Sequence, residues 1–81
     1  MMVSVKLFAA AKQFAKADSI TVEVPEPATV KALRLAISDQ FPQLKGILSQ
    51  AMIAIDTEYA SNDSIIPPQA EVACIPPVSG G

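Results

Sequence analysis

The stretch ITVEVPEPATVKALRLAISDQF, residues 20 to 41, encodes a strand, a stop and a helix in succession, and it decides the fold class. Ile20, Val22 and Val24 alternate with polar residues, a pattern typical of a strand with one buried face. Pro25 and Pro27 follow, and proline has no amide hydrogen to give to a strand ladder. We therefore expect the strand to end before Pro25.

A helix is expected after this stop. Thr29 can cap its first turn, and Pro42 closes it. Its apolar residues form one narrow stripe that we expect to face a core: Val30, Leu33, Ile37 and Phe41. Leu35 lies outside the stripe, so we expect it either on the surface or covering something else.

Shorter elements surround this helix. The other expected strands are residues 3–7, residues 52–55, a short strand around Tyr59 after an Asp56-Thr57 turn, and residues 71–75. Short helical turns are expected within residues 8–17 and near Gly46. In the first of these, Phe8, Ala11, Phe14 and Ala15 fall at near-helical spacing. A right-handed crossover through the main helix would place a late strand parallel to the first.

The predicted fold is therefore α+β of the β-grasp type, with a mixed sheet of four to five strands packed on one main helix. With 81 residues the chain has room for one domain only. We expect this domain to span residues 1–76, followed by a flexible Gly-Gly tail at 77–81.

Composition argues against several classes of protein. The net charge is −2 and the six basic residues are dispersed, which makes nucleic acid an unexpected partner. The longest apolar runs are far shorter than the roughly 20 residues that span a bilayer, and we find no secretion signal, so we expect a cytoplasmic protein without membrane contact.

The usual catalytic and metal-binding groups are missing from the sequence. There is no histidine, so neither a general base for a nucleophile nor a metal site is expected. Cys74 is interpreted as a small buried hydrophobe within a strand. Asp18, Asp56 and Asp63 lie beside turns, where an aspartate usually bonds its own backbone.

By elimination, the group positioned for chemistry is the terminal carboxylate of Gly81. It is ionised at neutral pH and needs activation, most simply adenylation by an ATP-using partner. Gly80 and Gly81 carry no side chains that would block a narrow channel, and Pro76 and Pro77 stiffen the approach. The plain alternative is a frayed chain end without function.

The ending Glu71-Val-Ala-Cys-Ile-Pro-Pro-Val-Ser-Gly-Gly81 resembles that of the small subunits of molybdopterin synthases, a family of ubiquitin-like sulfur carriers. The opening residues 3–9 resemble the first strand of that family. Two places depart from the family pattern: Pro68-Gln69-Ala70 replaces a glycine-acid turn, and Asp56 stands near a common asparagine.

The resemblance implies that a ubiquitin-activating-type adenylyltransferase uses ATP to adenylate Gly81, and that a sulfur donor converts it to a thiocarboxylate. It further implies a heterotetramer with the molybdopterin synthase large subunit, in which the thiocarboxylate donates sulfur to cyclic pyranopterin monophosphate. The carrier itself would bind no cofactor. The inserted tail would comprise Pro77, Val78, Ser79, Gly80 and Gly81.

A docking face is expected where the last strand meets the tail. Its candidate apolar anchors are Phe8, Ile75, Pro76 and Val78, unless Phe8 and Ile75 simply belong to the core. Three other functions remain open: a sulfur carrier of the thiamine-biosynthesis type, a ubiquitin-like protein modifier that is joined to lysines through Gly81, and a β-grasp interaction domain with an inert tail.

Overall fold

The structure is a computed structural model and describes residues 1–77. Five strands form one mixed sheet in the order β2-β1-β5-β3-β4. They are β1 (Met2–Leu7), β2 (Ser19–Glu23), β3 (Met52–Ile55), β4 (Glu58–Ala60) and β5 (Val72–Ile75). The helices are α1 (Ala9–Ala15), α2 (Val30–Gln40), α3 (Lys45–Leu48) and the 3-10 turn η1 (Pro42–Leu44). This is the expected β-grasp arrangement.

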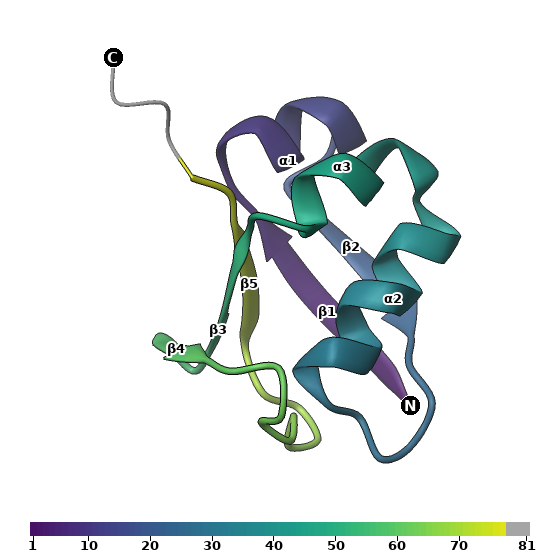
Figure 1. Ribbon diagram of the computed structural model, residues 1–81, viewed down its shortest axis with the longest axis vertical. Helices are drawn as coiled ribbons and strands as arrows, with labels where there is room; N and C mark the ends of the chain where they lie inside the picture. Colours follow the sequence, from purple (N-terminus) through teal and green to yellow (C-terminus); the bar gives the residue numbers. More distant parts are fainter. Residues whose placement is uncertain (78–81) are drawn as a thin grey trace.

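The last strand, β5, lies in the middle of the sheet because it pairs with β1 on one side and with β3 on the other. Strand β5 lies parallel to β1, with Leu7 opposite Cys74, and antiparallel to β3, with Met52 opposite Ile75. The predicted crossover that returns a late strand beside the first is therefore confirmed. Figure 1 shows β1 and β5 side by side, with α2 in front of one face of the sheet.

The core lies between the sheet and its helices. Val3, Val5 and Leu7 on β1 are buried, while the intervening residues of the strand are exposed. Strand β2 alternates in the same way. From α2 the core receives Val30, Leu33 and Ile37, as the stripe predicts, whereas Phe41 is only half-buried at the C-cap. One layer of helices thus covers one face of the sheet, and within residues 1–77 no helix covers the other face.

Local signals fixed the ends of α2 as expected. Thr29 Oγ1 accepts a hydrogen bond from the amide of Ala32 at 3.1 Å, which satisfies one of the free amides of the first turn. The helix ends at Gln40, two residues before Pro42. Leu35 is 63% exposed, so it lies on the surface.

Other expectations need correction. The helix α1 forms and buries Ala11, but its phenylalanine, Phe14, and its N-cap residue, Phe8, both stay outside the core. The carboxylate of Asp18 pairs with Lys12 Nζ at 2.9 Å, and Asp56 Oδ1 accepts from the amide of Glu71 at 2.9 Å. The expectation that these two aspartates bond their own backbone is therefore wrong. Strand β5 begins at Val72, one residue later than expected.

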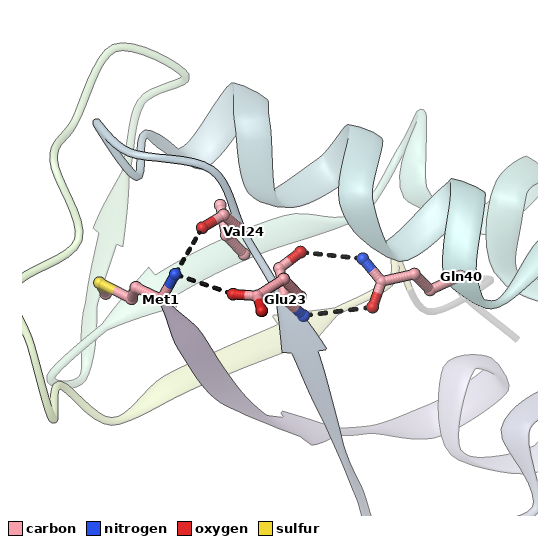
Figure 2. A network of polar contacts seen from close by, with 4 residues as sticks. All are labelled: Met1, Glu23, Val24 and Gln40. Atoms are coloured by element: carbon pink, nitrogen blue, oxygen red, sulfur yellow. Dashed lines mark hydrogen bonds and ion pairs between the residues drawn. The ribbon is translucent and has the colours of Figure 1, made fainter.

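A polar network surrounds the last residue of β2, Glu23, at the outer edge of the sheet, as Figure 2 shows. The carboxamide of Gln40 on α2 donates to the carbonyl of Glu23 at 2.8 Å and accepts from its amide at 3.1 Å. The amino group of Met1 contacts the Glu23 carboxylate and the carbonyl of Val24, both at 2.9 Å. Three segments distant in sequence are thereby held together.

Candidate functional site

The candidate site lies at the end of β5, where the described chain stops. Pro76 is buried and Pro77 is exposed, so the chain leaves the domain surface between these two prolines. The predicted tail residues Val78, Ser79, Gly80 and Gly81 lie outside the described residues. The structure therefore fixes the base of the tail.

The base of the tail is held in place because β5 lies inside the sheet and not at its edge. Strand β5 is paired on both sides, with β1 and with β3. Beyond the strand β1, the amide of Phe8 donates to the carbonyl of Cys74 at 3.2 Å, which brings Phe8 beside the end of β5. Because backbone hydrogen bonds hold both flanks, the direction in which the chain leaves at Ile75 is set by the sheet.

A hollow of about 350 Å³ lies on the open face of the sheet next to this exit. Its floor is made by Ala54 of β3 and Ala73 of β5, which are paired across the two strands. Larger side chains line its walls: Phe8, Tyr59 and Ile75. The small floor between large walls gives the face a concave apolar shape.

The exposure of these walls separates them from the core. Phe8 is 42% exposed and Tyr59 is 68% exposed, while Ile75 is partly buried. The possibility that Phe8 belongs to the core is therefore wrong. Pro76 is buried, so its ring already packs within the domain. Exposed apolar side chains gathered around a hollow are the usual mark of a binding surface.

Two charged residues also line the hollow, and one of them, Lys6, is paired with Ala73 of the floor. Lys6 and Glu71 line it together with the apolar walls, and its other lining atoms belong to uncharged residues. Among the described residues no cluster of three or more metal-ligating side chains occurs, and no helix is long and apolar enough to cross a membrane. The hollow therefore combines apolar side chains with one positive and one negative group.

Cys74 is a poor candidate for chemistry. Its side chain is fully buried beneath the sheet, as the sequence predicts. Burial raises the pKa of the thiol, and the positive charge of Arg34 offsets this only in part. A protonated, inaccessible thiol is not a nucleophile.

Sequence reasoning found Phe8 and Ile75 but missed Tyr59 and the alanine floor. One signal was available, because Ala73 and Ile75 alternate with the buried Val72 and Cys74 along the last strand. That alternation already assigns Ala73 and Ile75 to one face. The pairing of Ala54 with both Ala73 and Tyr59 has no signal in the sequence.

Comparison with known proteins agrees with this geometry. The sequence model of the ThiS family matches residues 5–81. The chain belongs to the ThiS family. This match includes the strand β5 and part of β1, and it extends through the four residues beyond the described structure.

Relatives of this ThiS-family chain support the resemblance seen in the sequence. The chain is 38% identical over 84 residues to the molybdopterin synthase sulfur carrier subunit of Caenorhabditis briggsae, covering 99% of this chain and all of the relative. The expected resemblance to molybdopterin synthase small subunits is confirmed.

Solved structures share its fold over the full length. SAMP1 of Haloferax volcanii superimposes with a TM-score of 0.85 at 26% identity, with complete coverage of both chains. A chain of the complex of subunits 1 and 2 of the molybdopterin-converting factor from Helicobacter pylori gives a TM-score of 0.69 at 26% identity, again with complete coverage.

Proposed function

We propose that this chain is the sulfur carrier subunit of a molybdopterin synthase in molybdenum cofactor biosynthesis. The observation that carries the proposal is the full-length similarity to a relative described as that subunit, together with a family match that runs to residue 81. The absence of histidine fits a chain that delivers a reactive group and leaves acid-base chemistry to its partner.

The reacting group in this proposal is the carboxylate of Gly81. One of its oxygens attacks the α-phosphate of ATP on a ubiquitin-activating-type adenylyltransferase, and pyrophosphate leaves. A sulfur nucleophile at the oxidation level of sulfide then displaces AMP and leaves a thiocarboxylate. The thiocarboxylate sulfur is transferred to cyclic pyranopterin monophosphate, and hydrolysis returns the carboxylate. ATP is used by the partner, in the cytoplasm, and the carrier holds no cofactor.

The proposed partner for sulfur transfer is the large subunit of the synthase, in a heterotetramer with two carriers. The similar Helicobacter pylori chain comes from a complex of two subunits, which supports such a partner. We assign docking to the hollow between Phe8, Tyr59 and Ile75, because it is apolar and adjoins the exposed Pro77. Pro76 would support the exit from within the domain, and Val78 would add a contact beyond it.

The test is the intact mass of the protein purified from its native host. The proposal expects a population in which sulfur replaces one oxygen at Gly81, located by fragmentation of the C-terminal peptide. Deleting Gly81 shortens the reach by about 3.3 Å and should abolish pterin product formed per carrier, with an unchanged circular dichroism spectrum. A folded deletion variant that supports normal product formation would refute the role of Gly81.

A second candidate function is protein modification, favoured by the similarity to SAMP1 of Haloferax volcanii, a small archaeal modifier protein. Both functions begin with the same activation of Gly81 and differ in the nucleophile that attacks the acyl group. A lysine amine would give an isopeptide bond in place of a thiocarboxylate. Mass spectrometry of tryptic digests distinguishes them, because only a modifier leaves its C-terminal residues attached to lysines of other proteins.

A further inference from the structure

A second surface lies away from the hollow, between the end of β2 and the outer side of α2. It is a groove of about 420 Å³ whose apolar lining includes Pro25 after β2 and Ala32, Leu35 and Ala36 on α2. Leu35 is 63% exposed here, although it sits in the middle of the main helix. Nothing in the proposed sulfur-carrier function uses this groove.

The backbone of β2 next to the groove has hydrogen-bonding groups that face outward. The even-numbered residues at the two ends of β2 bond toward β1. The carbonyl of Asp18 accepts a hydrogen bond from the amide of Leu7, and the amide of Val24 donates to the carbonyl of Met1. Because backbone groups alternate in direction along an antiparallel strand, the odd-numbered residues face the other way. Within the described residues β2 is an edge strand, so the backbone groups of Ser19 and Thr21 point to its open side.

Gln40 shows that this edge accepts a strand-like partner. Its carboxamide makes two hydrogen bonds with the backbone of Glu23, at 2.8 Å and 3.1 Å, as Figure 2 shows. One donor and one acceptor meeting one residue is the same pattern that a neighbouring strand would offer. Both bonds are exposed to solvent, so an incoming peptide amide can replace them with little loss.

The charge at the groove selects the kind of partner. Glu23 and Asp39 line it, and lysine and arginine are absent from its lining. Glu23 already holds one cation, the amino group of Met1, and no ion pair involves Asp39 within residues 1–77. A second copy of this chain would bring acidic groups against acidic groups, whereas a basic segment would be attracted.

We propose that the β2 edge and this groove bind an extended, basic segment of another protein. The segment adds a strand beside Ser19 and Thr21, takes the place of the Gln40 carboxamide at Glu23, and rests an apolar side chain on Leu35. A lysine or arginine of the segment pairs with Asp39. Strand addition to an exposed sheet edge is a recurring mode of peptide recognition.

The site lies on the outer edge of the sheet, where β1 separates β2 from β5, and its groove lies at the end of β2 away from the tail. Glu23 pairs with Met2 at the start of β1, whereas Cys74, near the end of β5, pairs with Leu7 at the end of β1. A partner held at the groove therefore leaves the tail base free. The inference does not depend on whether Gly81 carries sulfur. Its test can therefore succeed or fail independently of the proposed function.

The test uses the full chain labelled with ¹⁵N and three capped hexapeptides followed by nuclear magnetic resonance. All three have a central valine-isoleucine-valine run. The first has lysines at its ends, the second aspartates, and the third repeats the lysine peptide with the central amide N-methylated. We expect the lysine peptide to shift the amides of Ser19, Thr21 and Leu35, and the other two to bind about tenfold or more weakly.

Two variants separate strand addition from simple side-chain contact. Thr21→Pro removes an amide that faces away from β1, and an edge strand tolerates such a change. It should weaken binding of the lysine peptide about tenfold. Thr21→Val is the matched control. Gln40→Ala removes the competing carboxamide and should strengthen binding.

Three outcomes would overturn the proposal: no shift at β2 with any peptide, equal binding of the N-methylated peptide, or a concentration-dependent dimer through β2. The N-methylated peptide tests strand addition on the wild-type protein, so the proposal stays open to refutation even if Thr21→Pro does not fold.

Discussion

Arg34 is the polar residue on which the positions of three elements depend, and its replacement gives the sharpest stability prediction. From α2 its Nη1 atom donates to the carbonyls of Leu48 at 2.6 Å and Ala51 at 2.8 Å. Its Nε atom donates to Asn62 Oδ1 at 2.9 Å. The first two bonds cap the end of α3 and the start of β3, and both are partly buried.

The expected cost follows from these contacts. Arg34→Met keeps much of the side-chain volume but leaves two partly buried carbonyls without their charged donor. Each such bond contributes about 1 kcal/mol after discounting for solvent, and an unsatisfied carbonyl adds to the loss, so we expect about 2–3 kcal/mol in total. For a domain of this size that lowers the melting temperature by roughly 10–20 °C. Arg34→Lys retains a charge without the planar fork and should cost about half as much.

Urea denaturation followed by circular dichroism measures these differences. Asn62→Ala is the matched control, because its bond to Arg34 is exposed and its loss should cost only about 0.5 kcal/mol. Unchanged slopes of the denaturation curves would show that the free energy of unfolding is being compared fairly. If Arg34→Met costs no more than Asn62→Ala, the two carbonyl contacts do not stabilise the fold and the reasoning is wrong.

Three further predictions concern other residues. Thr57 has a φ of 71° in the two-residue turn between β3 and β4, so Thr57→Gly should stabilise the protein by about 0.5–1 kcal/mol in thermal melts, while Thr57→Ala should gain less. Burial raises the pKa of Cys74, so the free energy of unfolding should fall as the pH rises above the unfolded thiol value of about 8.5 towards the higher folded value. Titrated denaturation should show that this fall is smaller in Cys74→Ala. Phe8→Ala should weaken binding to the large subunit by about 1–2 kcal/mol in calorimetry, whereas Phe14→Ala, on a side chain 56% exposed outside the hollow, should leave it unchanged.

The sequence predicted those parts of the fold that repeat with a period. Alternation along residues 3–7 and 20–24 fixed two strands, and the stripe from Val30 to Ile37 fixed the main helix, because each pattern reports which side of an element is buried. The parallel return of the last strand followed from the handedness of crossovers. These features depend on neighbours within one element or on a general rule of chain topology.

Long-range polar contacts could not be predicted in this way. The bonds of Arg34 to Leu48 and Ala51, and those of Gln40 to Glu23, join residues 14 to 17 positions apart and leave no periodic trace. The alanine floor of the hollow was hidden for a similar reason. Alanine is common in helices and strands alike, and Ala54 and Ala73 acquire a function only when β3 and β5 are paired.

The place of β5 in the sheet suits the proposed function, in which a chain with little chemistry of its own presents a reactive end. A terminal segment that followed an edge strand would be held by one neighbour and could peel away locally, because edge pairing is lost at low cost. Strand β5 is instead held between β1 and β3, and Phe8 extends the pairing to the carbonyl of Cys74. Disturbing the exit therefore requires breaking the centre of the sheet. In the proposed function the four residues after Pro77 start from this fixed point beside the hollow, so contacts that a partner makes with the hollow would also determine where those residues are delivered.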